Sequence, residues 1–240
     1  MQQVLRKQII LLAGFIWIGS QGFGQYREQN RADHDNWPYY FGMSISYSHS
    51  YLHPSKDPRF LENDSVLSVE PGSSGGIALG LLATLQLSPR FSLRTNPQLI
   101  IGGAKYFTYS LKYPNIEGQT IEKKTLPSTI VSFPIQVKFN SDRIGNFRTY
   151  LLGGVKYDID LASNSTARNA EDLVKLKRSD IGVETGIGFN FFFPFVTFSP
   201  EIKFATGLSN IHSRDANLKY SSVLDKLQSR MIIFSIILED

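Results

Sequence analysis

The chain has 240 residues, a net charge of +4, 12% aromatic residues and no cysteine. That length suits one large all-β domain or two small domains. The lack of cysteine excludes a disulfide framework and a thiolate metal site. The mild positive charge is dispersed and forms no basic stripe, so the composition also excludes a nucleic-acid-binding protein.

The N-terminal 24 residues predict a secretory signal peptide. Basic residues precede an apolar run over residues 9–18, and a small-x-small motif ends at Gly24. A charged segment, a short apolar segment and such a cleavage site are typical of signal peptides. The alternative is a membrane anchor, but the apolar run is well short of the about 20 residues that span a bilayer. We therefore expect cleavage before Gln25, with Gln21 and Gly22 as the other candidate sites.

After a polar and irregular stretch over residues 25–38, which predicts a flexible lead, the chain alternates strictly between large apolar and small or polar residues. Period-2 alternation predicts β-strands. The chain ends Ile-Leu-Glu-Asp rather than in an aromatic residue, so the end of the last strand is weakly marked. The expected strands span residues 39–48, 77–87, 91–101 with an extension toward 109, 129–139, 147–159, a hairpin over 180–204 with its turn at Phe193-Pro194, and 231–238.

The connections between these strands alternate in length. Residues 88–90, residues 140–146 and the hairpin turn are short, whereas residues 51–74, 112–126, 162–179 and 206–229 are long and polar. Short turns on one side, long loops on the other and an even number of strands are typical of outer-membrane barrels. We therefore predict an all-β fold, an eight-stranded antiparallel up-and-down transmembrane β-barrel over residues 39–240, located in the outer membrane with both termini in the periplasm.

The two faces of the expected strands differ in charge. In the phase with the large apolar residues no Asp, Glu, Lys or Arg occurs, which fits a lipid-facing surface because a Lys or Arg at the bilayer midplane costs about 2–4 kcal/mol. A lipocalin-type soluble barrel would have an apolar cavity and a wet exterior instead. Because buried charges need partners, we expect a lumen charge network formed by Arg94, Lys138, Arg148, Lys156, Glu184, Glu201 and Lys203.

The prolines and glycines inside the strands lead to two further predictions. Pro97, Pro134 and Pro200 remove ladder donors from strands that have no free edge, so we expect β-bulges there or nearer strand ends. Glycines such as Gly182, Gly186 and Gly188 precede no helix, so they are not a phosphate-binding loop. We expect them to leave room in the lumen for long neighbouring side chains.

No motif in the sequence predicts catalysis, a cofactor or a metal. His34, His49, His53 and His212 lack the spacing of metal ligands and are expected to be solvated surface residues. A set of carboxylates could serve as an acid–base group, but no nucleophile and base are paired with it, so a structural lumen network is the preferred interpretation. These carboxylates are Asp158, Asp160, Glu184 and Glu201.

A short apolar motif stands out in the last long connection. Residues 221–227 predict a helical turn, on which Val223, Leu224 and Leu227 lie at apolar spacing. These three side chains either fold onto the rim of the barrel or contact a partner protein.

Several runs in the exported part of the chain resemble one protein family. They are residues 63–70 (NDSVLSVE), 133–139 (FPIQVKF), 143–148 (RIGNFR), 152–162 (LGGVKYDIDLA), 198–204 (FSPEIKF) and 220–227 (YSSVLDKL). These runs are similar to PorT, an outer-membrane β-barrel of Bacteroidetes that is required for type IX (Por) secretion and is linked in some members to gliding motility. The resemblance covers most of the mature chain and offers no enzymatic site to carry over.

The resemblance implies a non-enzymatic component or assembly factor of type IX protein secretion, whose partners are the lipid bilayer and other secretion-system proteins. An alternative is a small solute channel or ligand-binding barrel in the same membrane. A third hypothesis, from another class, is a barrel enzyme. Different measurements distinguish the three hypotheses. A secretion component predicts cargo trapped in the periplasm of a deletion strain, a channel predicts ion conductance, and an enzyme predicts hydrolase activity.

Overall fold

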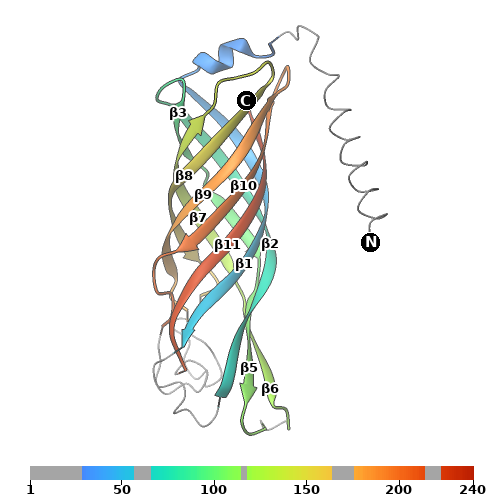
Figure 1. The fold of residues 1–240 in the computed structure, drawn as a ribbon, viewed down its shortest axis with the longest axis vertical. Helices are drawn as coiled ribbons and strands as arrows, with labels where there is room; N and C mark the ends of the chain where they lie inside the picture. Colours follow the sequence, from blue (N-terminus) through green and yellow to red (C-terminus); the bar gives the residue numbers. More distant parts are fainter. Residues whose placement is uncertain (1–28, 57–65, 115–117, 164–175, 214–222) are drawn as a thin grey trace, which may run out of the picture.

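The structure, a computed structural model, describes residues 29–56, 66–114, 118–163, 176–213 and 223–240; the expected signal peptide lies outside these ranges. The described chain is an elongated, closed sheet of antiparallel strands with one short 3₁₀ helix (Figure 1). Its elements are η1 (Ala32–Asn36), β1 (Tyr39–Lys56), β2 (Val66–Gln86), β3 (Phe91–Thr95), β4 (Gln98–Gly102), β5 (Lys105–Leu111), β6 (Ile121–Leu126), β7 (Thr129–Asn140), β8 (Phe147–Asp160), β9 (Ser179–Phe192), β10 (Thr197–Gly207) and β11 (Leu224–Glu239).

Pairing of the first and last strands closes the ring. β1 pairs antiparallel with β2 on one side and with β11 on the other, and the order then runs through β10, β9, β8 and β7. β3 and β4 both lie between β2 and β7, so they are two segments of a single barrel strand. Counted in this way, the ring has eight strands, and the expected all-β up-and-down barrel is confirmed.

The two ends of the barrel differ. The short connections over residues 87–90, 141–146 and 193–196 lie at the end that also carries η1 and the C-terminus (Figure 1). We name this the cap end. The opposite end, where β1 and β8 end and β9 and β11 begin, is named the loop end (Figure 1). The short connections expected from the sequence therefore lie together at one end.

Several segments that we expected to be polar connections contain strand instead. β1 continues to Lys56, β2 begins at Val66 and β11 begins at Leu224, while β6 occupies part of the expected connection over residues 112–126. Polar residues on the outward face of these extensions hide the period-2 pattern. Their buried positions include the apolar side chains of Leu52, Val66 and Leu224.

At the loop end part of the sheet leaves the ring. β1 and β2 separate after the pair Tyr51↔Ser73, and the outer part of β2 pairs only with β5, which pairs with β6. This three-stranded extension, which we name the ribbon, projects past the barrel wall (Figure 1). The bend from β4 into β5 uses Gly102 and Gly103, whose φ angles of 85° and 76° favour glycine because it lacks a Cβ.

The three prolines interrupt the ladder without shifting its register. Between Thr95↔Ile135 and Gln98↔Ser132 the β3/β4–β7 ladder has a gap over residues 96–97, opposite residues 133–134, yet the offset between the strands is unchanged. The Thr95 hydroxyl donates a hydrogen bond to the Pro134 carbonyl oxygen at 2.8 Å. The structure shows no β-bulge at these prolines, so that alternative is wrong. At Pro97 the other alternative, a nearer strand end, is confirmed, because β3 ends at Thr95 and β4 begins at Gln98.

The outer surface of the barrel is apolar and the inner surface polar. Exposed side chains such as Phe41, Ile45, Ile135, Ile187 and Phe189 form a continuous belt, while serine, asparagine and charged side chains alternate with them on the inside. The short-turn rim of the belt carries many aromatic rings, an arrangement typical of membrane barrels. No helix in the described ranges is long and apolar enough to span a bilayer.

Candidate functional site

An ion pair between β3 and β10 forms the centre of the barrel interior. The Arg94 guanidinium donates to a Glu201 carboxylate oxygen at 2.6 Å, and neither side chain has any exposed surface. The Tyr150 hydroxyl donates to the same carboxylate oxygen at 2.8 Å, and Lys203 lies 3.6 Å from the other oxygen. One carboxylate thus contacts two cations and a tyrosine hydroxyl, which come from β3, β10 and β8.

The network continues around the ring through an amide. Arg94 Nε donates to the Gln136 side-chain oxygen at 2.7 Å, and the Gln136 amide nitrogen donates to Glu184. Lys138 lies 3.9 Å from Glu239 and 4.0 Å from the centroid of the Tyr150 ring. Cations, carboxylates and one aromatic ring therefore cross the barrel interior at this level, where Arg94, Lys138 and Lys203 have no exposed surface.

Small residues make space for these long side chains. A Cβ at Gly188 would overlap the ring of Tyr150, and one at Gly186 would lie 2.9 Å from Cγ of Lys203. We expected these glycines to leave room in the lumen for long side chains. The structure agrees, because each glycine faces inward beside a bulky side chain.

A second polar cluster lies nearer the loop end. Lys156 pairs with Asp158, which also accepts a hydrogen bond from the Ser132 hydroxyl at 2.6 Å. Asp180 accepts a hydrogen bond from Ser229, and the buried Lys105 lies beside this cluster, lining the same small pocket as Asp158 and Asp180. This layer again contains charges of both signs, and Lys156 and Asp158 form an ion pair within it.

An apolar cluster closes the loop end. Its members come from β1, β2, the ribbon, β11 and the segments between them, and all are nearly or fully buried: Leu52, Val66, Val69, Phe107, Tyr109, Leu111, Leu126, Leu176, Ile211, Val223, Leu224 and Leu227. Each fully buried Leu or Phe stabilises the fold by about 1.5–3 kcal/mol. We name this group the loop-end cluster.

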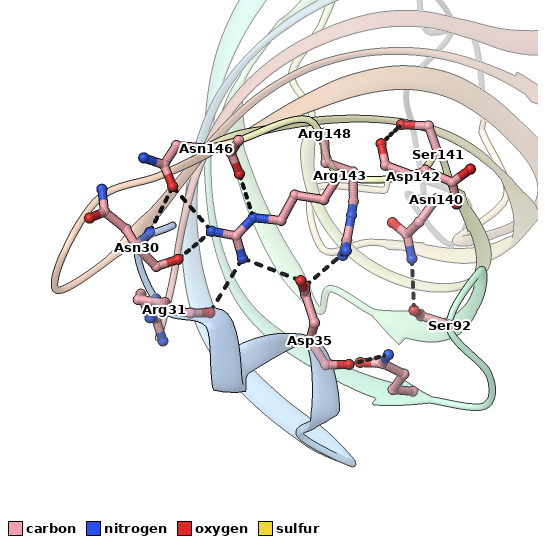
Figure 2. Close-up of polar contacts among 12 residues, drawn as sticks. Asn30, Arg31, Asp35, Ser92, Asn140, Ser141, Asp142, Arg143, Asn146 and Arg148 are labelled. Atoms are coloured by element: carbon pink, nitrogen blue, oxygen red, sulfur yellow. Dashed lines mark hydrogen bonds and ion pairs between the residues drawn. The ribbon is translucent and has the colours of Figure 1, made fainter. Parts of the chain in front are cut away.

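The cap end is closed by the segment that precedes β1. Asp35 of η1 pairs with Arg148 at 2.8 Å and with Arg143 at 3.3 Å, both from the turn and strand that begin β8 (Figure 2). Arg143 also donates to the backbone carbonyl of Asn30, and the Asn30 amide nitrogen donates to the Asn146 side chain at 2.8 Å. The guanidinium of Arg143 is therefore the centre of the cap.

A histidine anchors the same segment. His34 is 4% exposed and lies among the rings of Trp37, Tyr40 and Phe192, with Nε2 at 3.1 Å from the backbone carbonyl of Asp240. Burial, together with the nearby positive charge of Arg31, lowers the pKa of His34 below its ordinary value. The neutral imidazole is thus the form that the docked cap favours.

The structure separates the expected charge network into layers. Arg94, Lys138, Glu184, Glu201 and Lys203 come together at the centre, Lys156 belongs to the second cluster, and Arg148 pairs with the cap instead. Glu239, which is not among the charged residues expected in the lumen, also faces inward. It continues the inward phase of Ile233, Ser235 and Ile237 one step past the expected strand end.

Three further expectations are corrected. Residues 29–36 are held to the barrel rather than flexible, because the contacts of η1 cross the cap end. His34 and His212 are buried rather than solvated. Leu224 and Leu227 lie on a strand rather than a helical turn, and with Val223 they are buried in the loop-end cluster, where they do not offer a surface to a partner.

A closed, up-and-down sheet with an apolar exterior and a charged interior defines the class of outer-membrane β-barrels. Residues 25–213 match the family described as "Outer membrane protein beta-barrel domain", and the chain belongs to that family. Its location in the outer membrane follows from this membership.

Solved structures of similar fold include the Neisserial surface protein A (11% identity, TM-score 0.40, covering 82% of this chain and 95% of that one) and OprG from Pseudomonas aeruginosa (13%, 0.40, 82% and 94%). A third is Ail of Yersinia pestis, in complex with sucrose octasulfate (10%, 0.38, 85% and 100%). Among proteins with curated descriptions, none matches the chain.

Proposed function

We propose that this chain is a non-enzymatic outer-membrane barrel that acts as a component or assembly factor of type IX protein secretion, the role implied by the resemblance to PorT. The observation that supports a scaffolding role is the filled interior. Arg94, Lys138, Tyr150 and Lys203 are fully buried across the middle of the barrel. A lumen occupied by paired charges favours a function at the outer surfaces over transport through the barrel.

The ribbon is the surface that we assign to a partner protein. It extends beyond the barrel wall and presents the exposed apolar side chains of Leu67 and Ile121, while Tyr113 is exposed just after β5. Exposed apolar residues grouped on a projecting element are typical of interaction sites. In this proposal the cap end, with both termini, faces the periplasm and the ribbon faces outward.

Deletion of the gene and conductance of the purified protein test the role together. We expect secreted cargo to accumulate in the periplasm of the deletion strain, and the purified full chain to give no stable conductance in a planar bilayer. Stable ion conductance with normal cargo export would overturn the proposal and establish the channel alternative.

Site-directed photo-cross-linking in native membranes tests the assigned surface. A photo-reactive residue at Ile121 on the ribbon is expected to capture a secretion-system protein. The matched control is Phe195 in a short turn at the cap end, which is 91% exposed. Capture from position 195 alone would place the partner at the opposite end and contradict the assignment.

The absence of catalysis is part of the proposal. The carboxylates of Asp158, Glu184 and Glu201 each accept hydrogen bonds from buried side chains, and His34 contacts a backbone carbonyl. These groups are therefore engaged in holding the barrel together. A hydrolase screen tests this: activity that a single Ser, His or Asp substitution abolishes would show an enzyme instead.

A further inference from the structure

The outward surface of β1 and β11 changes from apolar to polar and basic toward the loop end. The outward cross-strand pair Tyr47↔Phe234 belongs to the apolar belt. Further along the same two strands, the outward pairs are Tyr51↔Arg230, His53↔Gln228 and Ser55↔Lys226. A band of basic and hydrogen-bonding side chains thus borders the apolar belt on its loop-end side.

A groove lies in the belt next to this band, on the side nearer the cap end. Its volume is about 730 Å³, and it is lined almost entirely by the apolar side chains of Ile45, Tyr47, Ile187, Ile202 and Phe234. Pro200 contributes to its lining; because proline is shorter than the Phe and Ile residues around it, the belt is hollowed at this position.

Arg230 lies on the loop-end side of the groove, and no carboxylate shares the outward face of β1 and β11 with it. The outward positions of β1 from Tyr39 to Ser55, and of β11 from Lys226 to Leu238, contain no Asp or Glu. Arg230 is half-buried rather than enclosed, and its Nε has no acceptor in the part of the chain that the structure describes. Such a cation is well placed for an anionic group that is not part of the chain.

The spacing between the groove and Arg230 fits a lipid. Arg230 precedes Phe234 by four residues, which is about 14 Å along a strand. An acyl chain seated beside Phe234 would therefore bring its headgroup to the level of Arg230 and Lys226, with Tyr51 and His53 close enough on the neighbouring strand to bond hydroxyl groups.

We propose that this face of β1, β10 and β11 is a binding site for a phosphorylated glycolipid of the outer leaflet. One acyl chain lies in the groove, the phosphate lies on Arg230 and Lys226, and the sugar hydroxyls meet the polar side chains of β1. We choose a glycolipid of the outer leaflet because, in the orientation of the proposed function, the loop end faces outward. The binding test itself is independent of any role in secretion.

Native mass spectrometry of the delipidated full chain, titrated with diphosphoryl lipid A, tests the site. We expect one tightly bound molecule, with weaker binding of monophosphoryl lipid A and of phosphatidylglycerol. The double variant Arg230→Gln/Lys226→Gln should lower the affinity at least about tenfold. The matched control Lys112→Gln removes a charge from an exposed position at the same end, outside the groove, and should leave the affinity unchanged.

A groove-filling variant tests the acyl-chain part of the site separately. Ile202→Trp should reduce lipid A binding, whereas Ile181→Trp, also in the belt but outside the groove, should not. Thermal unfolding identical to wild type confirms that each variant folds. Unchanged affinity in the folded variants, equal affinity for phosphatidylglycerol, or a dimer of the chain that covers the groove would each overturn the proposal.

Discussion

Arg94 and Glu201, separated by 107 residues in the chain, form a 2.6 Å salt bridge inside the barrel in which neither side chain touches solvent. Because they come from β3 and β10, they join distant walls of the ring. The pair thus connects two strands that share no backbone hydrogen bonds, and its effect on stability is the most direct test of the filled interior.

Removing the carboxylate should destabilise the barrel strongly. Glu201→Ala leaves Arg94 and Lys203 buried without their shared partner, and breaking a buried pair in this way costs about 3–5 kcal/mol. We expect a clear fall in the thermal unfolding temperature in detergent. The control Asp142→Asn breaks the exposed pair with Arg90, which is worth only about 0–1 kcal/mol. A Glu201→Ala barrel that melts like wild type would refute the ion-paired interior at this site.

The loop-end cluster should behave as a packed core. Leu227 has no exposed surface, so Leu227→Ala leaves a cavity that costs about 2–5 kcal/mol. The matched control is Leu238→Ala on the same strand, whose side chain is 44% exposed on the lipid face. Chemical denaturation should separate the two variants; equal stability would instead return Leu227 to the role of a surface contact.

Docking of the cap depends on one carboxylate. Asp35→Asn removes the charge that pairs with Arg143 and Arg148, and hydrogen bonds to charged groups contribute about 1.5–3 kcal/mol each. We expect faster amide hydrogen exchange over residues 29–36 without a comparable change in the barrel strands. Asp33→Asn alters a neighbouring exposed carboxylate and serves as the control. The same protection in both variants would contradict this account of the cap.

The cap should also loosen on acidification. The pKa of His34 is lowered in the docked state, chiefly by burial, so the docked cap binds a proton more weakly than the free segment does. Above about pH 6.5, the ordinary value for histidine, both states are neutral and docking is unaffected. As the pH falls below that value docking weakens, and the loss levels off below the lowered pKa.

Fluorescence of Trp37, whose ring lies 5.2 Å from that of His34, reports this transition in protein that lacks residues 1–24. His34→Gln cannot take up the proton, so its signal should stay flat over the same pH range. A wild-type signal that is also flat would exclude His34 as the titrating group.

The sequence by itself determined the eight strands of the ring, their two faces and the short connections between them. These features are local: period-2 patterning decides which side chains share a face, and the bilayer forbids charge on one of them. Lys138, Glu201 and Lys203 were therefore placed inward, and the closed barrel predicted, without knowledge of any contact.

Only the tertiary structure decided which inward residues meet. Pairing depends on the register and tilt of strands far apart in the chain, so Arg94 with Glu201, or Arg148 with Asp35 of the cap, could not be read from spacing. The ribbon and the cap escaped prediction for the same reason. Their polar sequences resemble loops, and they become ordered because neighbouring elements supply the partners that the local sequence lacks.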